Sequence, residues 1–441
     1  GDRVLLFMDD TPSYPATVMG AIRAGLVPVL INTLSPAELL DFYLTDSSAK
    51  VAVASETYRS LFAAVTTPVL FAADRPWAAA SASLPEHETR RTDMAFWMYS
   101  SGSTGRPKGV VHKHEDMAYT AHTYAKSVLK IGPDDICFSI PKIFFAYGFG
   151  NAITFPMSVG AATVLLSDRP TPERVFSQIE THRPTIVFGL PTIYTSLETH
   201  EKIDGVDMSS VRLFVSAAEI LSNELAQGWQ KRFGKPIIEG LGSTEMLHIY
   251  LSNEEKALRP GSAGRVVPGY AARLMTPDGR EAGDGEEGVM EVMGLSSAEY
   301  YWDRADKTAE TMKDGWIVTG DRFVRDEEGF YYFKGRADDL VKVSGQWVYP
   351  LEIELALNEH PKVVEACVQA VERKDKRLMI KAWVTPTIEP DTTLTKELQD
   401  YTKAALLPHK YPREIVYMSA LPKTGTDKID RQRLRALDTN R

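Results

Sequence analysis

Residues 99–109 read Tyr99-Ser100-Ser101-Gly102-Ser103-Thr104-Gly105-Arg106-Pro107-Lys108-Gly109 and directly follow an apolar run at 95–98. The glycines let the backbone come close to phosphate oxygens, and the hydroxyl groups and Lys108 supply hydrogen-bond donors and positive charge. A Walker loop needs glycine immediately before its lysine, whereas this chain has Pro107 there. A serine-rich surface loop is the alternative, but such a loop does not need the Pro-Lys-Gly ending. The stretch therefore predicts a phosphate-binding loop of a different kind.

Helix signals alternate with short β-branched runs around this loop. Ser35-Pro36-Ala37-Glu38 and Thr171-Pro172-Glu173 each place a capping hydroxyl, a proline and a glutamate at the start of a predicted helix. Ser222 is the predicted cap of another helix, which extends to Phe233. Strands are predicted between these helices, at 51–54, 185–188 and 236–239. The alternation favours parallel, doubly wound sheets in an α/β fold.

The sequence changes character after about Gly261. Pro277-Asp278-Gly279 and Gly283-Asp284-Gly285 are turn signals between short strands, and they predict a small, more antiparallel, barrel-like β portion. Further on, Pro350 begins a predicted helix whose apolar face carries Leu351, Leu355 and Ala356. We therefore expect a large N-terminal domain, residues 1–335, that contains the doubly wound sheets and the β portion. A small α+β C-terminal domain follows at 336–441.

Composition limits the class of protein and its partners. The chain has 441 residues, a net charge of −9 and two cysteines. The acidic balance gives no electrostatic reason to expect nucleic acid or an anionic membrane as partner. Cys137 and Cys367 lack a metal-like spacing, which predicts buried thiols and a reducing, cytoplasmic location. The uncharged run 143–167 is interrupted by Asn151 and Pro156, so we expect buried core there rather than a membrane span.

The loop at 99–109 and several later strings resemble, in the same order, the adenylate-forming acyl-CoA synthetases. This superfamily also includes carrier-protein adenylation domains and luciferases, and the resemblance covers essentially the whole chain. It implies that ATP and AMP are bound by Ser100, Ser101, Gly102, Ser103, Thr104, Gly105, Lys108, Ala217, Ala218, Glu219, Glu239, Gly240, Leu241, Gly242, Ser243, Thr244, Asp321 and Arg336. Family members generally carry several dozen residues before the segment that matches 1–4, so the N-terminal part is expected to be truncated.

Two of these strings imply how the nucleotide is held. Ile238-Glu239-Gly240-Leu241-Gly242-Ser243-Thr244-Glu245 resembles the segment beside the adenine and the α-phosphate, where Thr244 would contact phosphate and Glu245 would hold magnesium. Magnesium is a hard cation that takes few carboxylates and completes its shell with phosphate and water. Thr319-Gly320-Asp321 resembles the ribose-binding turn, in which the carboxylate accepts hydrogen bonds from both ribose hydroxyl groups. His112 and His114 form a His-x-His pair without a third ligand, so we predict no zinc site.

The last hundred residues imply a mobile small domain. Gly335-Arg336-Ala337-Asp338-Asp339 resembles the hinge motif, with Asp338 as the hinge and Arg336 near the ribose and phosphate. Pro422-Lys423-Thr424-Gly425-Thr426-Asp427-Lys428-Ile429 resembles the motif of the catalytic lysine, here Lys428. Asp427 replaces the usual glycine before that lysine, and the sequence leaves the effect of this departure open. The implied catalytic residues are Lys428, Thr244, Glu245 and Lys108.

The strings at 142–148 and 246–249 look most like those of benzoate-CoA ligases. They imply an acyl pocket formed by Phe145, Ala146, Tyr147, Gly148, Gly189, Gly242, His248 and Ile249. A flat apolar pocket of this kind suits an aromatic ring. Phe144 and Phe145 fit core packing equally well. Ser344, Gly345 and Trp347 resemble the loop that approaches coenzyme A, and the basic cluster at 373–377 fits either nucleotide phosphates or a solvated face.

The resemblance therefore predicts an ATP-dependent aryl-CoA ligase. Benzoate or a substituted benzoate would react with ATP, with Mg²⁺ bound, to an aryl-adenylate, and coenzyme A would then release AMP and give aryl-CoA. One alternative is an aryl-adenylating enzyme that loads a carrier protein, and another is a non-catalytic carboxylate or adenylate sensor. The predicted partners are these small molecules, with a homodimer as an option, and include neither nucleic acid nor membrane.

Overall fold

The computed structural model describes residues 1–81, 83–100, 107–337, 341–343, 346–373, 378–406, 409–423 and 429–439. Contacts divide the chain into two compact units. Gly1–Arg273, Glu291–Thr319 and Glu328–Tyr331 form the first unit, and Leu274–Met290, Gly320–Glu327 and Tyr332–Arg441 form the second. The domain boundary predicted between residues 335 and 336 stays a prediction.

A seven-stranded sheet in the first unit has the strand order β16-β6-β5-β2-β1-β3-β4. Its strands are β1 (Arg3–Phe7), β2 (Val27–Leu30), β3 (Val51–Ala54), β4 (Val69–Phe71), β5 (Met94–Ser100), β6 (Lys108–Lys113) and β16 (Tyr300–Tyr301). β1 to β5 run parallel, whereas β6 and β16 are antiparallel to their neighbours. Side chains alternate along β1, with Leu6 packed toward α1 (Ser13–Arg23) and Leu5 toward α2 (Leu39–Ser47). Both faces of the sheet are therefore buried.

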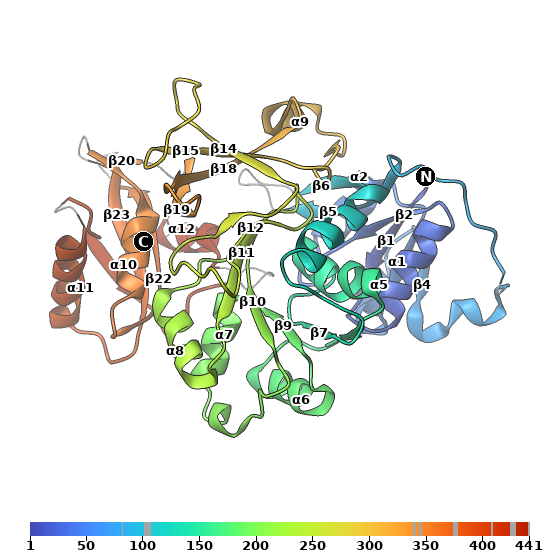
Figure 1. The fold of residues 1–441 in the computed structure, drawn as a ribbon, viewed down its shortest axis with the longest axis horizontal. Coiled ribbons are helices and arrows are strands. Elements are labelled where there is room, and N and C mark those ends of the chain that lie inside the picture. Colours follow the sequence, from blue (N-terminus) through green and yellow to red (C-terminus); the bar gives the residue numbers. More distant parts are fainter. Residues whose placement is uncertain are drawn as a thin grey trace. The chain divides into compact units, whose positions relative to one another are not determined.

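A second seven-stranded sheet has the order β13-β12-β11-β10-β9-β7-β8. It consists of β7 (Ile136–Ser139), β8 (Ala162–Val164), β9 (Ile186–Gly189), β10 (Leu213–Ser216), β11 (Ile237–Gly242), β12 (Ile249–Ser252) and β13 (Arg265–Val266). β7 to β11 are parallel, and β12 and β13 are antiparallel. Helices α6 (Pro172–His182), α7 (Pro191–Glu198) and α8 (Asn223–Phe233) lie beside this sheet (Figure 1). They pack Phe176, Tyr194 and Trp229 into one core with it. The two sheets confirm the predicted α/β architecture.

Local helix signals were correct where nothing competed for the capping side chain. Thr171 accepts a hydrogen bond from the Arg174 amide at 3.4 Å, and Ser222 accepts one from the Leu225 amide at 3.2 Å. The predicted start at Ser35 is wrong, because α2 begins at Leu39. The Ser35 hydroxyl lies 3.1 Å from the Tyr43 hydroxyl instead of capping, and the chain before α2 forms turns.

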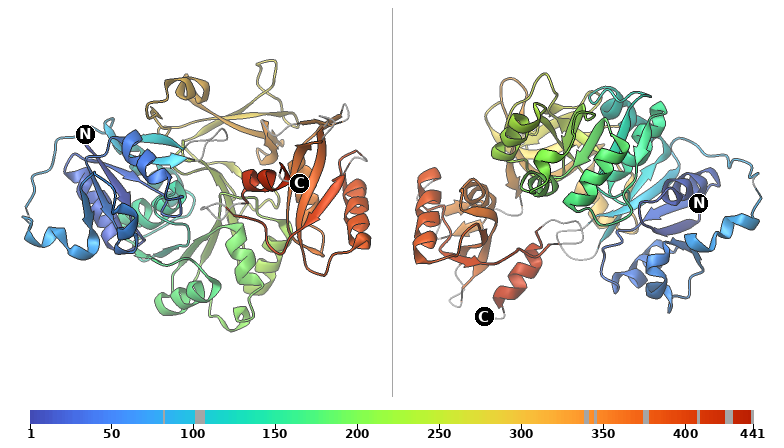
Figure 2. Two further views of the ribbon diagram at one scale, coloured as in Figure 1. Left: turned by 180° about the vertical axis from the view of Figure 1, so that it is seen from behind. Right: turned by 90° about the horizontal axis from the view of Figure 1, so that it is seen from below.

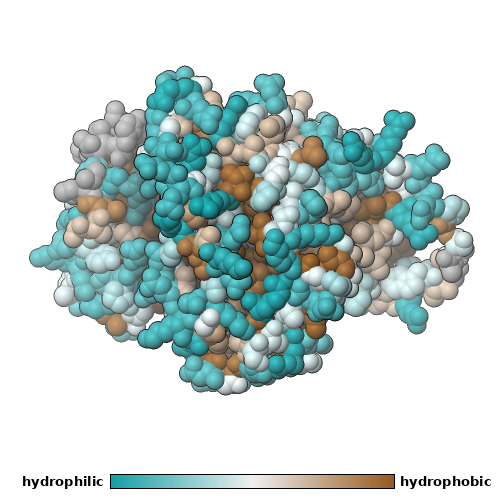
Figure 3. Space-filling model, viewed as in Figure 1, coloured by the Kyte–Doolittle hydropathy of each residue, from teal (hydrophilic) through white to brown (hydrophobic). Residues whose placement is uncertain are grey.

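The first part of the uncharged run 143–167, up to Pro156, is mostly buried as predicted, whereas most residues from Met157 to Thr163 are exposed or half-buried. The run forms α4 (Ala146–Phe149), the π-helical segment η5 (Gly150–Thr154), α5 (Phe155–Val159) and β8. A second π-helical segment, η4 (Ala121–Lys126), continues from α3 (His114–Thr120). The described part of the chain contains no helix with both the length and the apolar character that a membrane span requires. Hydrophilic residues cover most of the face that Figure 3 shows.

The predicted β-rich portion forms a five-stranded sheet. Its order is β14-β15-β18-β17, and β19 pairs with β18. The strands are β14 (Ala271–Met275), β15 (Glu287–Met293), β17 (Met312–Lys313), β18 (Trp316–Arg325) and β19 (Tyr331–Arg336), with α9 (Ala305–Thr311) between β16 and β17. Short 3₁₀ turns occur at η1 (Glu56–Phe62), η2 (Ala72–Asp74), η3 (Pro76–Ala79) and η6 (Ile203–Gly205).

The second unit contains a three-stranded sheet of β22 (Val363–Glu372), β23 (Leu378–Pro386) and β24 (Glu414–Tyr417). Helices α10 (Pro350–Asn358) and α11 (Thr392–Ala405) share one core with this sheet, and α12 (Arg431–Thr439) packs Leu434 with Cys367 and Trp383 in another. Figure 2 shows these strands and helices in orange and red. A hairpin of β20 (Val341–Val343) and β21 (Gln346–Val348) precedes α10. The predicted α10 face is partly wrong, because Ile353 and Leu357 are buried with Ala356 while Leu351 and Leu355 are only half-buried.

The two cysteine thiols are buried and unpaired, as predicted. Burial raises the pKa of each thiol to about 12. Both cysteines therefore stay protonated near neutral pH and act as small apolar residues.

Candidate active site

Four predicted site segments follow neighbouring parallel strands of the second sheet. Residues 142–148 come after β7, Gly189 ends β9, residues 217–219 follow β10, and residues 239–242 lie at the end of β11. Because these strands are adjacent in the order β11-β10-β9-β7, the segments lie in that order along one edge. The carboxyl ends of parallel strands are where open α/β sheets bind ligands. The fold thus brings the predicted nucleotide and acyl segments to the same edge.

Tyr147 and His248 pack together in the middle of the predicted acyl segment. Their rings lie 5.5 Å apart, and the Tyr147 ring also meets Phe188 edge-on at 6.2 Å. The Tyr147 hydroxyl donates to the Val215 carbonyl at 3.3 Å. His248 Nε2 lies 3.3 Å from the Tyr147 carbonyl and 3.2 Å from Asn151 Oδ1. Because both partners are acceptors, Nε2 carries the proton.

Burial holds the pKa of His248 at about 3, so the imidazole is neutral at physiological pH. Its ring contacts Phe155 at 4.4 Å and Tyr124, in the other π-helical segment, at 5.4 Å. π-Helical segments are rare and occur frequently at functional sites. His248 therefore forms a neutral aromatic wall that contacts both Tyr124 of η4 and Asn151 of η5, and it offers no charge to a carboxylate.

Close backbone approach explains why small residues surround this wall. A Cβ on Gly150 would lie 2.4 Å from His248 Cδ2, and one on Gly242 would lie 2.5 Å from the His248 carbonyl. The same holds at Gly189, where a Cβ would lie 2.8 Å from the Tyr194 ring, and at Gly148, where it would collide with the Lys142 carbonyl. Ala146 and Ile249 are buried nearby.

The two phenylalanines at the start of this segment belong to the core on one face of the first sheet. Phe144 is buried in the core below the first sheet, and Phe145 is half-buried against the same core with its ring 4.6 Å from that of Phe144. The Ile143 amide lies 3.3 Å from both carboxyl oxygens of Asp10. Burial raises the pKa of Asp10 to about 7, against the opposing charge of Lys142. Asp10 thereby fixes the start of the acyl segment.

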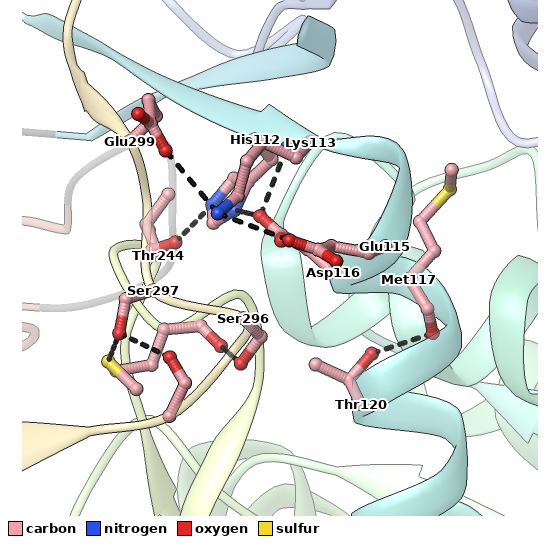
Figure 4. A network of polar contacts seen from close by, with 12 residues as sticks. His112, Lys113, Glu115, Asp116, Met117, Thr120, Thr244, Ser296, Ser297 and Glu299 are labelled. Atoms are coloured by element: carbon pink, nitrogen blue, oxygen red, sulfur yellow. Dashed lines mark hydrogen bonds and ion pairs between the residues drawn. The ribbon is translucent and has the colours of Figure 1, made fainter. Parts of the chain in front are cut away.

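The backbone of the turn formed by Thr244, Glu245 and Met246 is hydrogen-bonded to residues outside the turn. Each of its three carbonyls accepts a hydrogen bond from outside the turn, at Thr244 from His112 Nε2 (2.8 Å), at Glu245 from the Ala298 amide (2.7 Å) and at Met246 from the Ser296 hydroxyl (2.9 Å). Figure 4 shows His112 between Thr244 and Asp116. The position of this turn is therefore set by β6 and by the segment that precedes β16.

Sequence reasoning missed the role of His112. Its Nδ1 lies 2.8 Å from Asp116 Oδ2, which also accepts the Lys113 amide at 3.0 Å, and both side chains of the pair are 0% exposed. One ring nitrogen faces a carboxyl group and the other a carbonyl, so the pair must hold two protons to satisfy both contacts. The available signal was an aspartate four residues after a histidine. Among the described residues, no group of three His, Cys, Asp or Glu side chains is placed to hold a metal ion.

Glu245 and Lys108 meet at a tyrosine that the sequence did not single out. The Tyr301 hydroxyl donates to Glu245 Oε1 at 2.7 Å, and Lys108 Nζ lies 4.1 Å from the centre of the Tyr301 ring. Glu245 Oε2 has no hydrogen-bond partner among the described residues. A single half-exposed carboxylate with one oxygen to offer fits Mg²⁺, which takes its other ligands from phosphate and water.

Other predicted nucleotide residues lie around this turn. Ser100 pairs with Lys108 across β5 and β6, so the predicted phosphate loop connects two paired strand ends. Glu239 Oε1 accepts the Leu221 amide at 3.1 Å, and burial raises the pKa of Glu239 to about 8. The Glu219 carboxylate accepts a hydrogen bond from the Thr192 amide at 3.3 Å, and Ser243 Oγ accepts one from the Met246 amide at 3.2 Å. The Gly240 backbone packs against the Ile249 side chain. Ala217 is buried, Ala218 is exposed with φ 71°, and Leu241 is half-buried.

In the second unit, the structure brings together the two predicted ribose residues. Arg336 Nη1 donates to Asp321 Oδ1 at 3.1 Å. Gly320 has φ 73°, and a Cβ there would lie 2.8 Å from Arg336 Nη2. The turn before Asp321 therefore needs glycine both for its conformation and for the guanidinium beside it.

Several predicted residues lie outside the described residues and stay predictions. They are Ser101, Gly102, Ser103, Thr104, Gly105, Asp338, Ser344, Gly345 and Lys428, together with the side chain of Trp347. Of the basic cluster, only Arg373 is described.

Comparison with known sequences assigns the family. The AMP-binding enzyme profile matches residues 1–302, and the profile of the AMP-binding enzyme C-terminal domain matches residues 352–428. The chain belongs to the AMP-binding enzymes. The motif-based resemblance is thus confirmed, and this AMP-binding enzyme is an ATP-binding, adenylate-forming protein.

The AMP-binding enzyme has close relatives among aryl-CoA ligases. It is 42% identical to the benzoate–CoA ligase of Thauera aromatica over 99% of its own length and 86% of the relative. It is 39% identical to the 4-hydroxybenzoate–CoA/benzoate–CoA ligase of Rhodopseudomonas palustris, over 99% and 84%. A crystal structure of a benzoate CoA ligase from Burkholderia xenovorans matches with a TM-score of 0.92 at 37% identity, over 98% of this chain and 89% of that one. The enzyme is an AMP-forming acid–thiol ligase of the benzoate–CoA ligase type.

Proposed function

We propose that the enzyme converts benzoate or a substituted benzoate, ATP and coenzyme A into aryl-CoA, AMP and pyrophosphate. The observation that carries the substrate class is the neutral wall of Tyr147 and His248 at the sheet edge that also carries the nucleotide segments. A flat apolar ring gains from contact with aromatic side chains, and the neutral imidazole imposes no charge on it. Two relatives whose names specify benzoate support this assignment.

In the first step, a carboxylate oxygen of the acid attacks the α-phosphorus, and the bond to pyrophosphate breaks. No proton transfer is needed, because the acid is already ionised. The attack brings two anions together, so Lys108, Thr244 and Lys428 are proposed to stabilise the added charge. Glu245 would hold Mg²⁺, which supplies further positive charge beside the phosphates.

In the second step, the thiol of coenzyme A attacks the acyl carbon, AMP leaves and the thiol proton is lost. Ser344, Gly345 and Trp347 are proposed to approach coenzyme A, and Asp321 and Arg336 to bind the ribose. Rotation of the small domain about Asp338 would exchange the groups needed for the two steps. The homodimer and the cytoplasmic location stay predictions.

A pyrophosphate-release assay tests the proposal. The substrates are benzoate, hydroxy-, amino- and halobenzoates, with acetate and cyclohexane carboxylate as non-aromatic controls. We expect at least one benzoate to react more efficiently than both controls, and aryl-CoA to form when coenzyme A is added. A preference for acetate would contradict the substrate class. If adenylate accumulates and no thioester forms, the carrier-loading alternative is favoured. If the acid or the adenylate binds and no pyrophosphate is released, the sensor alternative is favoured.

A further inference from the structure

Residues 296–302, here called the bridging segment, connect two parts of the proposed phosphate site. On one side, the Ser296 hydroxyl and the Ala298 amide bond to the carbonyls of Met246 and Glu245 at 2.9 and 2.7 Å. On the other side, the segment bonds to β6 through Glu299 to Val111 at 2.9 Å and Trp302 to Gly109 at 2.8 Å. The bridging segment thus links the strand that begins with Lys108 to the turn that carries Glu245.

Tyr301 lies inside this bridge. It is 3% exposed and pairs with Val110 across β16 and β6. Its hydroxyl donates to the Glu245 carboxylate, and its ring faces the Lys108 ammonium. A hydroxyl bound to a carboxylate is a charge-assisted hydrogen bond, and an ammonium over an aromatic ring is a favourable cation–π contact. One side chain therefore contacts both groups through neutral atoms.

Tyr301 carries no charge, which distinguishes its contacts from an ion pair. Lys108 and Glu245 carry opposite charges, and a direct ion pair would satisfy each with the other. The ammonium would then be less available to phosphate, and the carboxylate less available to a cation. Tyr301 orients both groups without neutralising either, which leaves their charges for the ligands.

We infer that Tyr301 is a positioning residue for adenylation, which holds Lys108 and Glu245 in place while keeping their charges uncompensated. This inference rests on the proposed function and adds a residue to it. Tyr301 contacts Lys108 and Glu245, so its effect acts through the metal and the phosphates that these two groups are proposed to bind.

The test compares Tyr301→Phe, which loses only the hydroxyl, with Tyr301→Leu, which also loses the ring. Tyr300→Phe is the matched control, because Tyr300 is the neighbouring residue on the same strand and points to the opposite face. There it lines a surface cavity of about 550 Å³ with Trp302 and Arg304, away from Glu245.

The first readout is the binding of Mn²⁺, a paramagnetic substitute for Mg²⁺, measured by electron paramagnetic resonance. The titration is done in the presence of α,β-methylene-ATP. The second readout is the Mg²⁺ concentration that gives half-maximal pyrophosphate release. Tyr301→Phe loses one hydrogen bond to a charged group. It should therefore bind Mn²⁺ about 10-fold more weakly and need about 10-fold more Mg²⁺ for half-maximal pyrophosphate release. At saturating Mg²⁺ the rate should return to within about threefold of the wild-type rate, because the bound cation then orients Glu245. Tyr301→Leu should also raise KM for ATP.

Equal Mn²⁺ affinity and Mg²⁺ response in Tyr301→Phe and Tyr300→Phe would overturn the inference. A lower rate in Tyr301→Phe that excess Mg²⁺ does not restore would also overturn it, since a general loss of structure gives that result. If the wild-type enzyme releases no pyrophosphate with any aryl acid, the proposed function fails. The Mn²⁺ titration would still decide the role of Tyr301.

Discussion

Asp10 is a buried carboxyl group that contacts the start of the predicted acyl segment. It is 3% exposed, and its two oxygens share the Ile143 amide at the start of the acyl segment. Burial raises its pKa from 3.8 to about 7, whereas the nearby Lys142 charge acts in the opposite direction. The folded protein therefore favours the neutral acid over the carboxylate.

This preference makes stability depend on pH. Because folding raises the pKa of Asp10, its contribution to stability is fully present below 3.8, the pKa in the unfolded chain. That contribution is lost as pH rises through about 7, the pKa in the folded protein. The shift corresponds to on the order of 4 kcal/mol. Asp10→Asn, which cannot ionise, should therefore gain stability relative to the wild type between pH 4 and 8. Urea unfolding over this range measures the difference. The control is Asp134→Asn at an exposed position, which should show no such trend. If the difference in unfolding free energy between Asp10→Asn and the wild type stays constant over this pH range, the assignment is refuted.

At the scale of elements, the π-helical segment η5 determines how closely the backbone approaches His248. Gly150 begins η5, and Asn151 beside it bonds to the imidazole. A β-carbon at Gly150 would lie 2.4 and 2.6 Å from two ring atoms of His248. The ring is held by Tyr147 and Asn151 and packed against Phe155, so it has no low-energy way to move.

Gly150→Ala should therefore destabilise the fold by about 1–3 kcal/mol, the usual range for overpacking a core. KM for the aryl acid should rise as well, because His248 must shift, while KM for ATP should change little. Gly20→Ala is the control, since Gly20 lies in α1 with no atom within 4 Å of the added carbon. That variant should be neutral or slightly more stable. Thermal unfolding and steady-state kinetics of both variants decide the matter, and equal stability would show that the wall tolerates the methyl group.

At the scale of the whole molecule, the proposed reaction needs two compact units that act in sequence. Lys428, in the C-terminal part of the second unit, is proposed to serve only the first step. Lys428→Ala should lower adenylate formation by about 100-fold or more, because the ammonium offsets the charge of the attack. Thioester formation from supplied aryl-adenylate should remain near the wild-type rate.

Pyrophosphate release and thioester formation are measured separately for this prediction. Lys423→Ala is the matched control, because Lys423 lies in the same segment and is paired with Glu365. It should retain both steps. Equal loss of both steps in Lys428→Ala would mean that the lysine supports the fold or the second step as well.

Much of the architecture follows from short-range signals in the sequence. The caps at Thr171 and Ser222, the turn-rich β portion and the order of helices and strands depend on residues a few positions apart, and these were correct. The two failures at element scale, at Ser35 and on the face of α10, arose where a tertiary contact overrode a local preference. Ser35 gives its hydroxyl to Tyr43, and α10 turns Ile353 and Leu357 toward the sheet of its unit.

Motif identity and spacing in the sequence were enough to assign the family, and they predict the phosphate loop and the residue types of the site. Only the tertiary structure revealed the residues that hold the site together. His112 reaches Thr244 across 132 positions, and Tyr301 reaches Glu245 across 56. Such contacts depend on how sheets and loops pack, and no local pattern encodes them. The loop at 99–109 predicts a phosphate site, whereas the contact of Tyr301 with both Lys108 and Glu245 depends on how β6, β16 and the turn at Glu245 pack.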